Sequence, residues 1–312
     1  MSDAYLLDSR RMAEFVARGF LKFDALIPEA INTAFMASLP SAERAEGEPL
    51  MMSYGRMLAQ SGVPEIAAGS PFAEAFDAPS PLGRLFALPE VQGIIRSLVG
   101  ADPIFDHHFL HFAFPPAFYR DGDPPQRAQD LHQDSTIDPR RSAFDIQIMY
   151  YPHAIGPGDG GTRYVPGSHL RVVSEVAIGR YQNVLGQQHM TCPAGTLLVL
   201  HHGLWHGGGI NRGAGLRTMY KVRLNPAVPQ VRLWDTSDLT EADGAQRPIF
   251  LRTRPTPQDE LHETLMRLEP WYEADTGRLE LLARARLWRS LLGDAQADID
   301  YWLTRVENEP TA

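Results

Sequence analysis

Between residues 103 and 225 the chain breaks into short apolar runs separated by glycine and proline, and this pattern limits the possible folds more than any other feature. The runs are rich in β-branched and aromatic residues, as is typical of strands. The expected strands are residues 104–114, 131–134, 144–151, 163–165, 196–201 and 217–224. Turn clusters such as residues 156–161 and 207–209 lie between them. Several short strands with glycine-rich corners predict an antiparallel sandwich or barrel.

Helical patterns flank this β region on both sides. Before it, the expected helices are residues 8–17, 28–39 and 89–99, with a short strand at residues 20–23. After it, residues 259–268 and 279–306 have leucine-rich helical faces. The chain contains no internal repeat and no low-complexity linker. We therefore expect a single domain over residues 1–312, mainly β, with its core at about residues 103–225 and helical flanks at residues 1–102 and 258–308.

Charge and hydropathy exclude several classes of partner. The formal net charge is -9, which offers no general attraction to nucleic acid or anionic lipid. No stretch approaches the roughly 20 apolar residues of a membrane span. The single cysteine, Cys192, has no partner for a disulfide and is expected to be a small buried residue. These features indicate a cytoplasmic protein that binds a small molecule, in an oligomeric state that the sequence leaves open.

His132 and Asp134, separated by one residue, are the first candidates for binding a metal. Side chains alternate along a strand, so these two residues would point to the same face. One imidazole and one carboxylate would then converge on a point. The pattern His-x-Asp is common by chance, so it needs a third ligand from elsewhere in the chain.

His206 is the best candidate for that ligand. It ends an apolar segment and is followed by three glycines, where backbone can approach closely and leave one face open. Two histidines and one carboxylate on one face, with the remaining positions free, form the facial triad of non-haem Fe(II) oxygenases. Zinc hydrolases can use the same three ligands.

Other histidines compete for this role. His201 and His202 lie just upstream of His206, but they belong to a strand end. The group at positions 107, 108 and 111 lacks a carboxylate at metal-binding spacing, so we expect core or pocket-lining roles for it. Asp130 shares the face of His132 and is either a support for that histidine or a solvated residue.

Arg217 is the candidate for binding 2-oxoglutarate, eleven residues after His206 at the start of a strand. If this co-substrate chelates iron at one end, a cation must hold its far carboxylate, and a guanidinium does so with two charge-assisted hydrogen bonds. The chain's cations are nearly all arginines, with only Lys22 and Lys221 as lysines. Such a composition suits planar recognition of carboxylates.

Two residues of the segment 144–151 are further candidates for contact with the co-substrate. Gln147 and Met149 share a face of this expected strand. If that face points inward, Gln147 can donate a hydrogen bond to 2-oxoglutarate and Met149 can pack on it. The alternative is that Gln147 faces solvent.

Three segments together resemble the phytanoyl-CoA dioxygenase family of Fe(II)/2-oxoglutarate oxygenases. They are His132-x-Asp134, the sequence Gly-Gly-Thr-Arg-Tyr-Val-Pro-Gly-Ser-His at residues 160–169, and the stretch from His206 through three glycines to Arg217. The resemblance covers roughly residues 103–225. The chain departs from the pattern at two positions, with Phe114 before the double proline where many members have lysine, and Gly208 where many have a small hydroxyl residue.

The resemblance implies a double-stranded β-helix, or jelly-roll, core of the cupin-like type. It also implies dependence on Fe(II), 2-oxoglutarate and O2, with iron held by His132, Asp134 and His206, and it makes His169 part of a structural turn. Halogenating relatives leave the carboxylate position vacant, so Asp134 favours hydroxylation, desaturation or ring closure. The expected function is oxidation of an unactivated C–H bond of a small metabolite or amino-acid-like compound, with release of succinate and CO2. The alternatives are a jelly roll that binds a small molecule without turnover and a zinc hydrolase.

Overall fold

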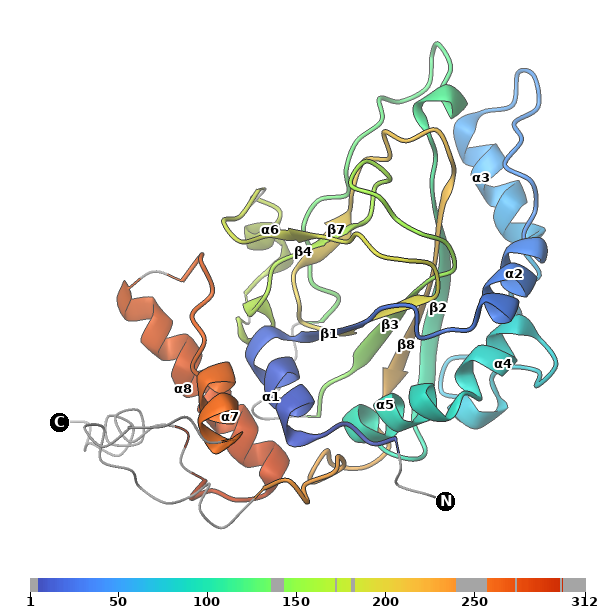
Figure 1. Cartoon of the computed structure of the whole chain (residues 1–312). Helices are drawn as coiled ribbons and strands as arrows, with labels where there is room; N and C mark the ends of the chain where they lie inside the picture. The colour runs from blue at the N-terminus through green and yellow to red at the C-terminus, as the bar shows by residue number, and fades with distance from the viewer. Residues whose placement is uncertain are drawn as a thin grey trace.

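The computed structural model describes residues 5–135, 143–171, 173–180, 183–239, 257–272, 274–297 and 299, and shows two antiparallel sheets with helices on one side (Figure 1). The larger sheet has the order β1-β6-β3-β8-β2 and the smaller one the order β5-β4-β7. The strands are β1 Phe20–Phe23, β2 Ile104–Ala113, β3 Ile146–Tyr151, β4 Thr162–Tyr164, β5 Gln188–His189, β6 Thr196–His201, β7 His206–Gly208 and β8 Arg217–Asn225. This arrangement is a double-stranded β-helix with helical flanks, as the sequence predicts.

Strand β3 shows how the larger sheet separates two environments. All six of its residues are buried, because both faces of the sheet are covered. Ile146, Ile148 and Tyr150 belong to the core cluster shared with the helices, whereas Met149 and Tyr151 belong to a second apolar cluster that includes Tyr164 of the smaller sheet. Alternate residues of β3 therefore face either the helices or the space between the sheets, and the second group points toward the site.

Helices from both ends of the chain cover the outer face of the larger sheet. They are α1 Ser9–Arg18, α2 Glu29–Ala37, α3 Leu50–Ala59, α4 Pro81–Phe86, α5 Pro89–Val99, α7 Pro257–Leu265 and α8 Ala274–Leu292. The short helix α6 Glu175–Ile178 lies apart from them, beside the smaller sheet (Figure 1). In Figure 1, α7 and α8 lie beside α1, and α1 contacts both of them. No helix among the described residues is both long and apolar enough to span a membrane.

Most predicted elements lie within three residues of the observed ones, and the segments 131–134 and 279–306 differ more. Residues 131–134 form a single bridge at His132 and no strand. Helix α8 starts earlier than expected and ends at Leu292, because Gly293 adopts a left-handed conformation with φ 64°. The predicted continuation to residue 306 is thus wrong at residues 293–297, and its last part lies outside the described residues. Helices α3, α4 and α6 and strands β5 and β7 were not predicted, and β7 lies where a turn cluster was expected at residues 207–209.

Gly19 joins α1 to β1 where only glycine fits. Its φ is 77°, and its N–H donates to the carbonyl of Phe15 at 2.7 Å. A Cβ at this position would lie 2.5 Å from Nδ1 of the buried His169. We expect Gly19→Ala to lower the free energy of unfolding by about 3 kcal/mol or more, because left-handed strain and steric overlap add.

Urea denaturation would measure this loss, with Gly47→Ala as a matched control. Gly47 also has a positive φ, 72°, but no heavy atom lies within 4 Å of the site of its missing Cβ. The control is expected to lose only the backbone contribution, about 1–2 kcal/mol. Equal losses in the two variants would contradict the proposed contact between Gly19 and the ring of His169.

Candidate active site

The structure brings His132, Asp134 and His206 together. Each offers one ligand atom, and these atoms all lie within 4.8 Å of one another. His132 and His206 also pair through their backbones, each donating its N–H to the carbonyl of the other at 2.9 Å. The convergence expected from the sequence is therefore present, although the bridge between these two residues, and not a strand at residues 131–134, produces it.

The glycines after His206 allow residues 129–130, which lead to His132, to pass close to β7. A Cβ on Gly207 would lie 2.8 Å from the carbonyl oxygens of both Gln129 and Asp130. Gly208 donates its N–H to Oε1 of Gln129 at 3.1 Å, and the N–H of Gln129 donates to the carbonyl of Gly208 at 3.0 Å. The segment that leads to His132 is thus held against β7.

Backbone carbonyls orient both imidazoles for metal binding. Nδ1 of His132 lies 3.0 Å from the carbonyl of Asp130, and Nδ1 of His206 lies 2.9 Å from the carbonyl of Leu204. A carbonyl only accepts, so each Nδ1 carries the proton and each Nε2 keeps a free lone pair. These Nε2 atoms lie 3.6 Å and 3.5 Å from the carboxylate oxygens of Asp134. The three side chains therefore fit a divalent metal ion, with hydrogen bonds of the kind that orient metal ligands.

The protonation states of the triad also suit a cation. Burial opposes the charge of Asp134, but His206 and the ammonium of Lys221 outweigh it and hold the pKa of this carboxyl below its usual range. Burial lowers the pKa of His206 to about 4. At neutral pH the site therefore offers a charged carboxylate and a neutral imidazole, the forms that bind metal.

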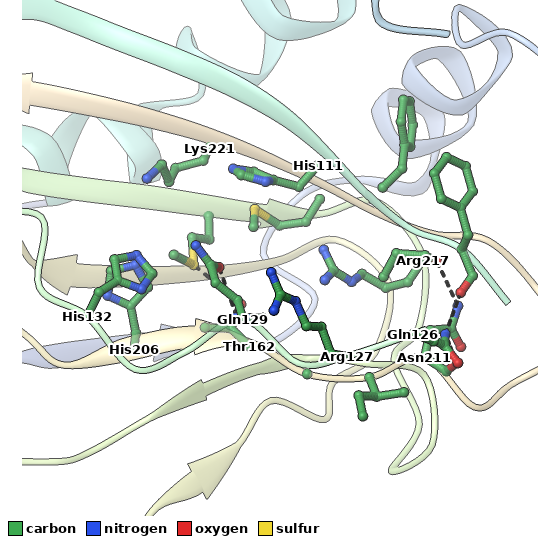
Figure 2. Close-up of a pocket in the computed structure, with 18 of the residues that line it drawn as sticks. His111, Gln126, Arg127, Gln129, His132, Thr162, His206, Asn211, Arg217 and Lys221 are labelled. Carbon is green, nitrogen blue, oxygen red and sulfur yellow. Dashed lines mark hydrogen bonds between the residues drawn. The ribbon is translucent and has the colours of Figure 1, made fainter. Parts of the chain in front are cut away.

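A cavity of about 210 Å³ runs from the two histidines along β8 (Figure 2). Its volume is at the small end of ligand sites. The lining combines basic, amide and apolar side chains: His111, Phe112, Ala113, Phe114, Tyr119, Gln126, Arg127, Gln129, His132, Met149, Thr162, His206, Gly208, Gly209, Ile210, Asn211, Arg217, Met219 and Lys221.

Arg217 lies in this cavity with part of its guanidinium unpaired. Its side chain is 5% exposed, and its Nε donates to the carbonyl of Gly160 at 3.1 Å. Nη1 is buried without a hydrogen-bond partner, and no carboxylate of the described residues forms an ion pair with this side chain. Burial lowers the pKa of Arg217, yet a guanidinium remains charged. A buried cation of this kind needs an anion, and the described residues do not supply one.

Gln147 and Met149 both face the space between the sheets. Gln147 is fully buried, so the alternative of a solvent-facing side chain is wrong. Its Nε2 lies 3.3 Å from Nε2 of His206, and its Oε1 is buried without a partner. Met149 lines the cavity. The side-chain amide of Gln147 can thus reach a group bound beside His206.

The competing histidines have other environments. His202 is buried, with Nε2 3.8 Å from Oδ2 of Asp134, so it lies just behind the triad. His201 packs against His169, whose Nε2 contacts the carbonyl of Val16 at 3.1 Å. This contact lies at the turn formed by residues 167–170. His169 therefore belongs to a turn, as the family resemblance implies, and Cys192 is buried as expected.

The sequence alone predicts no role in the site for Lys221 or Thr162 and a core or pocket-lining role for His111, and all three line the cavity. Lys221 follows Arg217 by four positions, so strand alternation alone puts the two on one face. Burial, followed by the charges of Lys221 and Arg217, lowers the pKa of His111 to about 3, so this imidazole is neutral. Thr162 lines the cavity with its hydroxyl 2.7 Å from that of Tyr151, a contact between distant segments with no local signal.

A known family matches the part of the chain that contains the site. Residues 61–219, just over half of the chain, match the profile of the family described as phytanoyl-CoA dioxygenase (PhyH). No curated protein matches the chain's sequence. The match includes all three triad residues and Arg217.

Solved structures resemble the chain at low sequence identity. EvdMO1 is 15% identical, with 70% of this chain and 49% of that chain covered and a TM-score of 0.48, so the chain spans about half its length. AviO1 from Streptomyces viridochromogenes Tue57 is 18% identical, with 72% and 97% covered and a TM-score of 0.48. EctD from S. alaskensis with 2-oxoglutarate and 5-hydroxyectoine is 16% identical, with 72% and 78% covered and a TM-score of 0.49. These values carry no argument about function.

Proposed function

This chain belongs to the phytanoyl-CoA dioxygenase family, and from that premise we propose that it is an Fe(II)/2-oxoglutarate-dependent dioxygenase that hydroxylates a C–H bond of a small molecule. The balanced reaction consumes the substrate, 2-oxoglutarate and O2, and yields the hydroxylated product, succinate and CO2. Family membership supports the class of oxygenase. The hydroxylation itself is our proposal.

The proposal depends on one observation. A set of metal ligands with an open side shares its cavity with a buried guanidinium that pairs with no carboxylate of the described residues. The triad alone would also suit a zinc hydrolase, which has no need of Arg217. A co-substrate with a metal-chelating end and a distant carboxylate suits both features. Of the small molecules that such enzymes use, 2-oxoglutarate has this form.

Each residue of the site has a role that follows from its contacts. His132, Asp134 and His206 would hold Fe(II), which supplies the oxidising chemistry when it is bound with O2 and the co-substrate. Arg217 would bind the far carboxylate of 2-oxoglutarate, and the amide of Gln147 would donate to its metal-binding end. Met149 would pack on the co-substrate and exclude water from it. The carbonyls of Asp130 and Leu204 keep the Nδ1 protons of the histidines in place.

A spectroscopic experiment tests this assignment. Anaerobic addition of Fe(II) and 2-oxoglutarate is expected to give a weak visible charge-transfer band, and admission of O2 with substrate should release succinate. A protein that binds a small molecule without turnover would give no succinate. A zinc hydrolase would copurify with zinc, take up no oxygen and show no band with Fe(II) and 2-oxoglutarate. The behaviour of the non-catalytic binder or that of the hydrolase would contradict the proposal.

A further inference from the structure

The roles described above account for Arg217 but leave a second buried cation, Lys221, without a function. Lys221 lies on β8 and is 7% exposed. Four residues separate it from Arg217, so the two side chains leave the same face of the strand at Cα positions about 13 Å apart. Figure 2 shows Lys221 at the same end of the cavity as His132 and His206, whereas Arg217 lies further along it.

Lys221 pairs with Asp134, which is also a candidate metal ligand. Its Nζ lies 3.3 Å from Oδ2 of Asp134, and no other carboxylate of the described part of the chain pairs with it. The next inward-facing residue of β8, Arg223, differs because it pairs with both Asp106 and Asp145. When Asp134 binds a divalent cation, its charge is shared with that cation. Lys221 then remains in a buried position with too little negative charge beside it.

The edge strand β2 supplies two further groups at this point. Phe109 is opposite Lys221 in the β2–β8 register, and its ring centroid lies 5.6 Å from Nζ. His111 is opposite Met219, and its Nε2 is buried without a hydrogen-bond partner. The ring of Phe109 is 52% exposed. An ammonium and a free imidazole nitrogen therefore line the cavity beside the metal ligands, and the exposed Phe109 lies next to the ammonium.

We propose that Lys221 and His111 bind a carboxylate of the substrate, with the apolar body of that substrate lying against Phe109. The inference rests on the proposed function and specifies its substrate class as a small organic acid. A carboxylate fits better than a phosphate because the cavity measures only about 210 Å³ and Arg217 lies further along it. When Asp134 binds a metal, Lys221 loses part of the negative charge beside it, and the substrate carboxylate replaces that charge.

Binding of benzoate and of its neutral analogue benzamide tests the proposal. The protein is first saturated with Zn(II) and 2-oxoglutarate, so that the triad and Arg217 are occupied, and each probe is then titrated calorimetrically. Benzoate is expected to bind about thirtyfold more tightly than benzamide, as for a buried charge pair. In Lys221→Met the preference for benzoate should disappear while Zn(II) still binds. Phenyl phosphate should bind more weakly than benzoate, and the reverse order would overturn the assignment to a carboxylate.

The lysine content of the chain provides a second measurement that needs no variant. Lys22 and Lys221 are the only lysines, so protein labelled with ¹³C-lysine gives two sets of side-chain NMR signals. Lys22 lies at the surface beside Asp24, and Lys22→Met is the matched control. Benzoate is expected to shift the Lys221 signals and leave those of Lys22 unchanged, and the control variant should keep the full preference.

The outcomes separate the inference from the proposed function. If the wild-type Lys221 signals do not respond to benzoate, or if Lys221→Met keeps the benzoate preference, the substrate assignment is wrong. If Lys221→Met loses Zn(II) and leaves the preference unaltered, Lys221 instead positions Asp134, and the inference is also wrong. In each of these cases the charge-transfer band of the Fe(II) and 2-oxoglutarate complex is still expected. Absence of that band in the wild-type protein contradicts the proposed function itself.

Discussion

Replacing Asp134 with alanine is expected to abolish succinate formation and to weaken binding of Mn(II) or Fe(II) by more than about 100-fold. Loss of a residue that only supports a metal ligand typically costs 10–100-fold, and Asp134 is proposed as a direct ligand. Its removal leaves two imidazoles beside the ammonium of Lys221, which was 3.3 Å from the lost carboxylate. The site would change from one that attracts a cation to one that repels it. Calorimetry of metal binding and a succinate assay measure the two effects.

Asp130→Ala is the matched control for this prediction. Asp130 is an exposed acid four residues earlier, and its described contribution to the site is the backbone carbonyl that accepts from Nδ1 of His132. The control variant keeps that carbonyl and should keep both metal affinity and activity. Full activity in Asp134→Ala would refute the ligand assignment. Retained metal with lost activity would point to His202, 3.8 Å from Asp134, as a substitute ligand.

The sheet could be predicted because its central strands carry their signal locally. The segments that became β3 and β6 are apolar on both faces, and β6 ends next to a glycine turn. Such runs are too short for helices and are bounded by turn residues, so strand is the consistent assignment. The prediction failed at residues 131–134, where one bridge replaces a strand. Whether this segment forms a strand or a single bridge depends on its pairing with His206, which is distant in the chain. The local sequence therefore cannot predict it.

The helical errors have local causes. The helix Leu50–Ala59 contains Gly55 and several methionines, and Met51 and Met52 are exposed although apolar, so the sequence does not show which face is buried. The end of α8 had a usable signal, because a glycine follows Leu292 and glycine is the usual residue after a helix end. The leucine-rich pattern that supported the helix stops at Leu292, and only Leu303 follows that glycine, so the extension to residue 306 had little support.

The candidate site shows the same division between local and distant information. Strand alternation brings Arg217 and Lys221 to one face and does the same for Gln147 and Met149, so these positions can be read from spacing. The space in which Lys221 meets His111 depends on which strand lies beside β8. That neighbour is β2, about a hundred residues earlier in the chain. Only the assembled sheet could therefore reveal the second cationic subsite.

Arg217→Ala is expected to raise the concentration of 2-oxoglutarate needed for half-maximal activity by about thirtyfold or more, with little change in metal affinity. The guanidinium is buried, is held through Nε by the carbonyl of Gly160, and keeps Nη1 free for an incoming carboxylate. Removal of one partner of a buried, hydrogen-bonded charge pair costs about 2–5 kcal/mol, which corresponds to this range or beyond. Lysine at this position keeps the charge but loses the fork of donors, so Arg217→Lys should give an intermediate requirement.

Arg212→Ala separates this effect from a general loss of positive charge. Arg212 is exposed and lies five residues earlier in the loop before β8. Its removal changes the net charge by the same amount as Arg217→Ala, and the requirement for 2-oxoglutarate should stay at the wild-type value. Succinate assays over a series of 2-oxoglutarate concentrations, with Mn(II) titrations in parallel, provide the comparison. An unchanged requirement in Arg217→Ala would mean that another cation of the cavity, such as Arg127, holds the far carboxylate.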